Sequence, residues 1–140
     1  MDNIKLELRL SLPDDFLHSI FVTAMEGGVT WWEVLNWKWA TPDGKDELRE
    51  FFAQVEVRED APTPTLPIVF PDHPRRVYVH HRTILKGLQR VMDREGSIKI
   101  HETLRGEIAA SIVTGDAGQI DAEQADIILQ AALFNEIVFG

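Results

Sequence analysis

The stretch DAEQADIILQAALFNEIVFG, residues Asp121 to Gly140, decides the fold. Asp121 followed three residues later by Gln124 is the pattern of a capping box, which predicts that a helix begins here. The apolar residues that follow cover more than one stripe of this helix: Ala125, Ile127, Ile128, Leu129, Ala131, Ala132, Leu133 and Phe134. A helix that is apolar on several sides is buried, so the sequence predicts a C-terminal helix at the centre of the protein.

Three further helices are expected where apolar residues recur at helical spacing. The first begins near Ser11 and ends at Gly27-Gly28, where glycine accepts the left-handed conformation that stops a helix. The second runs from about Arg82 to Arg94, and the third from Glu102 to Thr114. Each of these two is followed by a glycine, which supports its predicted end.

Strands are predicted where apolar and polar residues alternate. They lie at Ile4–Leu10, Val29–Ala40, Glu50–Glu59 and Arg76–His80. The second and third flank the turn signal Thr41–Gly44 and predict an antiparallel hairpin, with a short helix over Lys45–Phe52 as the alternative. A long proline-rich loop is expected over about 59–74, with a candidate short strand at 67–70.

The order of these elements indicates the fold class. A strand, a helix, several strands and then helices is an α+β pattern, whereas repeated βαβ units would indicate a parallel sheet. We therefore expect one α+β domain over residues 1–140, with an antiparallel sheet of about four strands packed with three to four helices.

The composition sets limits on the chemistry. The chain has 140 residues, 44% of them hydrophobic, and no cysteine. A domain of this size buries about two thirds of its unfolded surface and folds without metal or disulfide. The missing cysteines exclude disulfides, thiolate metal sites and cysteine nucleophiles. The first ten residues contain no continuous apolar stretch, so we expect no signal peptide, no membrane span and a cytoplasmic location.

The net charge of −9 bears on possible partners. An acidic protein repels the phosphate backbone, so general nucleic-acid binding is not expected. The charge is compatible with ordinary solubility. It is also compatible with an acidic surface that faces the basic groove of a nucleic-acid-binding protein.

Three segments carry a resemblance to a known family. They are TAMEGG at 23–28 followed by Trp31 and Trp32, ILKGL at 84–88, and ADIILQAALF at 125–134 ending in VFG. They resemble small proteins encoded by tailed bacteriophages and prophages, in which Ala-x-Glu-Gly-Gly precedes aromatic residues and a similar apolar helix ends the chain. Trp31 replaces a usual tyrosine, and Asn135 replaces a frequent glycine. The resemblance implies phage origin and action in the bacterial host cytoplasm, and it assigns no catalytic residue.

Two small constellations could carry chemistry. Glu26 beside Gly27-Gly28 places a carboxylate where a ligand or backbone can approach closely, although the glycines can simply end a helix. His80 and His81 lie between a strand and a helix and could act as acid or base. Neighbouring histidines point in opposite directions on a strand, and no metal-ligand spacing is visible, so a buried histidine and a capping histidine are the plainer alternative.

A basic stripe is the third candidate. Arg82, Lys86, Arg90 and Arg94 recur every four residues on the second long helix. Residues 75–94 carry six basic side chains and one acidic, while the rest of the chain carries eight basic and 22 acidic. This patch could hold an anionic ligand, pair with the acidic stretch at 43–60, or form a solvated face.

The tryptophans are the fourth candidate. By simple alternation Trp31, Trp37 and Trp39 face one side of a strand with Leu35, and Trp32 faces the other. One of the two faces therefore exposes an aromatic ring unless both are covered. Core or dimer packing and a partner-binding surface are the two interpretations.

These observations favour a small phage or prophage accessory protein that binds a bacterial host protein or protein complex and inhibits a host defence or regulatory system. No catalytic motif, metal site or cofactor site is indicated, and homo-oligomers are compatible with the pattern. The candidate binding residues are Trp31, Trp32, Trp37, Trp39, Glu26, His80, His81, Arg82, Lys86 and Arg90. A small anionic-ligand-binding protein or hydrolase using Glu26, His80/His81 and the Arg82/Lys86 stripe is one alternative, and a self-associating structural phage protein is another.

Overall fold

The computed structural model describes residues 12, 14–40, 50–66 and 70–139. Its elements are α1 (Asp14–Thr23), η1 (Ala24–Gly28), β1 (Trp32–Ala40), β2 (Glu50–Val57), β3 (Arg76–His80), α2 (His81–Met92), α3 (Glu102–Thr114), η3 (Ala117–Gln119) and α4 (Ala122–Phe134). The three strands form one antiparallel sheet in the order β1-β2-β3. The predicted α+β class is confirmed, with three strands among the described residues where about four were expected for the chain. The expected strand Ile4–Leu10 lies outside the described residues.

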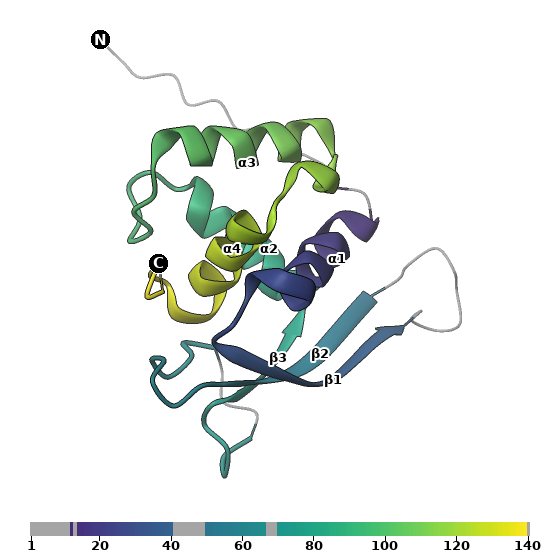
Figure 1. The fold of residues 1–140 in the computed structure, drawn as a ribbon, viewed down its shortest axis with the longest axis vertical. Helices are drawn as coiled ribbons and strands as arrows, with labels where there is room; N and C mark the ends of the chain where they lie inside the picture. Colours follow the sequence, from purple (N-terminus) through teal and green to yellow (C-terminus); the bar gives the residue numbers. More distant parts are fainter. Residues whose placement is uncertain (1–11, 13, 41–49, 67–69, 140) are drawn as a thin grey trace, which may run out of the picture.

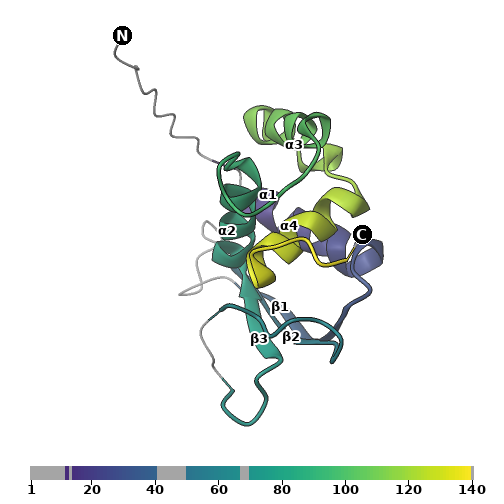
Figure 2. The same ribbon diagram turned by 90° about the vertical axis from the view of Figure 1, so that its left-hand side faces the viewer.

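The molecule has two layers, with the α-helices on one face of the sheet (Figures 1 and 2). The sheet turns its small and β-branched apolar residues toward these helices: Ala53, Val55, Val57, Val77 and Val79 are all buried. Alternate residues of the same strands point to the opposite face because side chains on a strand alternate. In the described part of the chain no helix covers that second face, which we call the outer face (Figure 1).

Helix α4 lies at the centre of the helical layer, as predicted. Every residue from Ile127 to Phe134 is buried, and Asp121 with Gln124 forms the expected capping box. Gly87 explains how closely α2 approaches this helix. A Cβ atom added to Gly87 would lie 2.3 Å from the Ile128 carbonyl oxygen, so the crossing accepts no side chain there.

The carbonyl groups at the end of α4 are buried and need hydrogen-bond donors. Arg90 on α2 reaches across, and its Nη1 donates to Ala131 O at 2.8 Å and Ala132 O at 2.9 Å. The Thr65 backbone N–H donates to Leu133 O at 2.7 Å. The proline-rich loop and α2 therefore both fix the end of the central helix.

Strand β1 contains a bulge that the alternation rule did not anticipate. Val34 pairs with Val55 and Asn36 pairs with Gln54, so Leu35 is an extra residue in the register. Trp32 and Trp37 pair with the buried Val57 and Ala53, which places both tryptophans on the helix-facing side. The predicted division of the tryptophans between two faces was wrong, because one inserted residue reverses the parity of all that follow.

The end of the first helix also differs from the prediction. Residues Ala24–Gly28 continue α1 as a π-helical turn, which the Val29 N–H closes by donating to Ala24 O at 3.0 Å. Gly27 does not adopt the left-handed conformation, whereas Gly115 after α3 does, with φ of 69°.

The region between β1 and β2 bears on the alternative helix over Lys45–Phe52. Residues 50–52 belong to β2, so this helix does not extend over them. The predicted turn at Thr41–Gly44 and most of the candidate strand at 67–70 lie outside the described residues.

Candidate functional site

The outer face of the sheet presents two rows of side chains, one residue from each strand. Glu33, Glu56 and Arg76 form the first row, and Asn36, Gln54 and Tyr78 form the second. Tyr78 is 40% exposed. Its ring contacts Phe70 from the proline-rich loop, with centroids 5.1 Å apart. The face is therefore polar and charged, with the exposed Tyr78 and the half-buried Phe70 at its β3 side.

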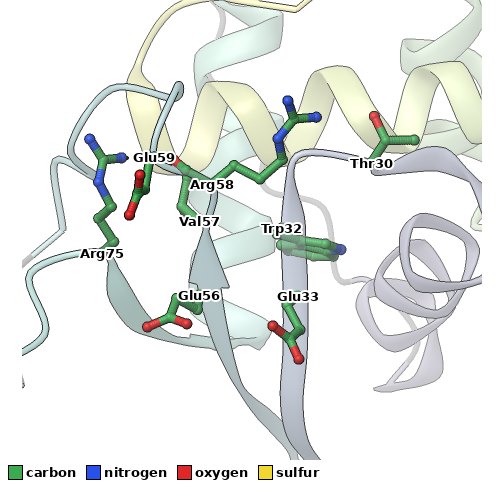
Figure 3. Close-up of a pocket in the computed structure, with 8 residues that line it drawn as sticks. All are labelled: Thr30, Trp32, Glu33, Glu56, Val57, Arg58, Glu59 and Arg75. Carbon is green, nitrogen blue, oxygen red and sulfur yellow. Dashed lines mark hydrogen bonds between the residues drawn. The ribbon is translucent and has the colours of Figure 1, made fainter.

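A pocket of about 360 Å³ lies where β1 begins and β2 ends (Figure 3). Its lining consists of Thr30, Trp32, Glu33, Glu56, Val57, Arg58, Glu59 and Arg75. The strands and the first part of the proline-rich loop position these groups together. Its volume is in the range of small-ligand sites, which is about 300–1,000 Å³.

Local interactions occupy the cations around this pocket. Arg58 pairs with Asp60 at 2.7 Å. Arg75 Nη1 donates to the carbonyl oxygens of Arg58 at 2.8 Å and Ala61 at 2.6 Å, so its side chain is fixed by the loop backbone. Arg76 reaches Glu56 at 3.4 Å.

Two carboxylates at the pocket have no such compensation. Glu33 and Glu59 make no hydrogen bond or ion pair with any residue that the structure describes. Glu33 is also directly opposite Glu56 in the register, and like charges at opposed positions destabilise a sheet. The pocket therefore retains uncompensated negative charge.

Trp31, expected as a binding residue, belongs to the core. It is 1% exposed, and its Nε1 donates to Asp126 Oδ1 at 2.6 Å. Its ring stacks on Phe139 with centroids 6.2 Å apart and contacts Phe134 at 5.1 Å. Burial raises the pKa of Asp126, and the hydrogen bonds from Trp31 and Gln130 oppose this rise.

Gln130 holds the C-terminal segment against this cluster. Its Oε1 accepts from the backbone N–H groups of Val138 at 2.8 Å and Phe139 at 2.9 Å. Its Nε2 donates to Phe139 O at 3.0 Å and to Asp126 Oδ1 at 3.1 Å. The buried amide thus explains why the last residues turn back along α4.

The other tryptophans have different surroundings. Trp32 is 9% exposed, packs on Phe21 with ring centroids 5.8 Å apart, and lines the pocket. Trp37 is 38% exposed and stacks on His18 of α1 at 5.5 Å. Trp39 pairs with Phe51 in the register, and its side chain is outside the description.

Glu26, His80 and His81 do not line the pocket. His80 is the N-cap of α2, where its Nδ1 accepts from the Arg82 N–H at 3.1 Å and Thr83 completes a capping box. The His81 ring lies 5.6 Å from the His80 ring. Glu26 is exposed on η1 and makes no hydrogen bond or ion pair within the described ranges.

The basic stripe has divided roles. Arg90 is committed to the end of α4, as described above. Arg94 pairs with Glu102 at 3.3 Å. Arg82 and Lys86 remain exposed on α2. The stripe and the histidines meet at the start of α2, where the backbone N–H of Arg82 donates to His80 Nδ1.

Sequence reasoning missed two features. Arg105 is 6% exposed, donates to Val91 O at 2.8 Å and Ile98 O at 3.3 Å, and pairs with Glu102. The pocket carboxylate Glu33 was also not singled out. The opposition of Glu33 and Glu56 depends on the register of two strands, which the sequence alone does not give.

Neither a metal cluster nor a membrane span appears in the part of the chain that the structure describes. No three His, Asp or Glu side chains there converge in a way that could hold a metal ion. None of the helices there has the length and apolar character needed to cross a membrane.

Comparison with protein-family models, with curated proteins and with solved structures finds no match to this chain.

Proposed function

We propose that this chain is a binding protein that engages a bacterial host protein through the outer face of its sheet. The observation that carries this proposal is the one-sided packing of the sheet, because the helices lie on one face (Figure 1). The other face presents polar rows and the exposed Tyr78, and a pocket lies at the end of the strands (Figure 3). Aromatic residues with surrounding polar groups are typical of protein-binding surfaces.

The biological setting of the proposal comes from the sequence. The AMEGG run and the C-terminal apolar helix resemble small proteins of tailed bacteriophages and prophages. We therefore propose an accessory protein that acts in the bacterial host cytoplasm and blocks a host defence or regulatory system. The acidic surface supports a basic protein partner, since complementary charge steers association.

The proposal is tested by recovering the tagged protein from a bacterial host under native conditions and measuring intact masses. Gln54→Arg and Tyr78→Ala alter the outer face, whereas Gln89→Arg adds the same charge to the exposed side of α2. We expect a stoichiometric host protein with the wild type and with Gln89→Arg, and its loss with both outer-face variants. A bare wild-type chain, or a partner that both outer-face variants retain, would contradict the proposal.

A further inference from the structure

Strand β1 forms a free edge of the sheet. The order β1-β2-β3 pairs β1 on one side only, and no residue in the described part of the chain pairs with its other side. Over nine residues, every second N–H and C=O group of β1 therefore points away from β2. An edge of this length is a template for pairing with another strand.

The same strand carries two exposed apolar side chains. Leu35, the extra residue in the register, is 39% exposed, and Trp37 is 38% exposed. Trp37 stacks on His18 of α1, which holds its ring on the helix-facing side of the strand. A second strand beside β1 would satisfy the backbone groups and remove apolar surface from water, so both features favour a strand as the partner.

The charges of β1 bear on which strand fits. Glu33 and Lys38 are the two charged residues between Trp32 and Ala40. Glu33 pairs with Glu56, and Lys38 pairs with Phe52, which is four residues earlier on β2. Both positions therefore belong to the outer face. In a regular strand, residues five apart face opposite sides, so the bulge in β1 is what brings the two charges onto one face.

Glu33 lacks a cation within its own copy. It makes no hydrogen bond or ion pair with any described residue, and Glu56 lies directly opposite it on β2. If two copies pair antiparallel through β1, Glu33 of one copy can lie opposite Lys38 of the other, and the two-fold symmetry forms this pair twice. Since β1 has only these two charges, no other antiparallel register of the two strands opposes unlike charges.

The apolar positions agree with this register. Placing Glu33 opposite Lys38 also places Val34 opposite Trp37. Val34 and Trp37 pair with Val55 and Ala53 of β2, so both belong to the helix-facing side. Charged positions thus meet on the outer face and apolar positions meet on the other, as cross-strand pairing requires.

We infer that a second copy of this chain docks on the free edge of β1, antiparallel, with Glu33 of each copy opposite Lys38 of the other. The two sheets then form one continuous sheet about a two-fold axis perpendicular to it, so both outer faces lie on the same side. The proposed host-binding surface is thereby presented twice. The inference does not rest on the proposed function, because the dimer forms without a host protein.

The first test measures the mass of the purified full chain by sedimentation over a range of concentrations. We expect a dimer that dissociates on dilution. Hydrogen exchange of the unaltered protein locates the interface, and we expect slower exchange of the β1 amides in the dimer than in the dilute monomer. A chain that stays monomeric at the concentrations used for nuclear magnetic resonance, or a dimer with unchanged exchange in β1, overturns the inference.

Charge exchange gives the second arm of the test. Glu33→Lys and Lys38→Glu each oppose like charges twice in a homodimer, so we expect each to weaken self-association by at least about tenfold. Glu95→Lys makes the same charge change at an exposed site after α2 and is expected to leave the dimer unchanged. A mixture of Glu33→Lys with Lys38→Glu restores unlike pairs, so we expect a heterodimer. Labelling one variant with nitrogen-15 identifies this species in native mass spectra.

The outcomes separate the register from other causes. Homodimers of wild-type strength in either variant, or two folded variants that form no heterodimer, overturn the inference. Circular dichroism shows whether the variants fold, and the exchange comparison on the unaltered protein decides if they do not. A monomeric wild type that still captures the host protein would overturn this inference and leave the proposed function intact.

Discussion

At the scale of single residues, the buried polar groups hold specific backbone segments in place. Gln130 uses both ends of its amide on the C-terminal segment, and Arg105 satisfies carbonyls at Val91 and Ile98. Buried polar groups are retained where they are fully hydrogen-bonded, because an unsatisfied group costs about 1–3 kcal/mol. These side chains therefore define the path of the chain between the helices.

Asp126 gives a prediction about pH. Its pKa is raised above 3.8 by burial, so the folded state binds this proton more tightly than the unfolded state. Its contribution to stability is therefore fully present below 3.8 and is lost as the pH rises through the raised folded pKa. Asp126→Asn keeps the acceptor for Trp31 and removes this titration.

The measurement for Asp126 is urea unfolding of the wild type and Asp126→Asn between acidic and neutral pH. Subtracting the free energy of unfolding of one protein from that of the other cancels the titration of the groups that both proteins share. We expect the variant to gain stability relative to the wild type as the pH rises. A difference that stays constant across this range would show that Asp126 does not titrate as described.

Gly87 gives a prediction about packing. Gly87→Ala places a methyl group against the Ile128 carbonyl, and overpacking of this kind costs about 1–3 kcal/mol. The matched control is Gly106→Ala on α3, where a Cβ meets nothing within 4 Å. The control is expected to stabilise by about 0.5–1 kcal/mol, since alanine is the better helix former. Chemical denaturation measures the free energy of unfolding of both variants. Equal changes in Gly87→Ala and Gly106→Ala would be inconsistent with a tight crossing at Gly87.

At the scale of elements, the end of α4 depends on groups supplied by other segments. Arg90→Met removes the donor to Ala131 and Ala132 and is expected to destabilise the fold by about 1.5–3 kcal/mol. Lys86→Met, on the same stripe but exposed, is expected to change stability by less than about 0.5 kcal/mol. Thermal or chemical unfolding distinguishes them, and similar losses for both would argue against a capping role of Arg90.

The elements also show which features local sequence can predict. Helix α3 was predicted at its observed bounds, and the capping box of α4 was confirmed, because both depend on residues within one turn of each other. The bulge at Leu35 has no local signal, yet it places Trp37 on the same side of β1 as Trp32. The pocket escaped prediction for the same reason, since Glu33 and Glu56 meet only through the register of two strands.

At the scale of the whole molecule, the helical layer provides the core, and the outer face is the surface that we propose for binding. The helices bury the core against one side of the sheet, and α4 is contacted from several directions. The residues of the two outer-face rows are not part of that core. The proposed host partner therefore contacts a surface whose alteration leaves folding largely intact.

The most direct measurement of this central claim uses Tyr78, the one tyrosine of the chain. Tyr78 is 40% exposed on the outer face, so its nitration reports the accessibility of that face alone. We predict that nitration of Tyr78, followed by intact mass, is about tenfold slower in the purified complex with the host protein than in the free chain. An unchanged rate in a stoichiometric complex would contradict the account, because the partner would then bind elsewhere.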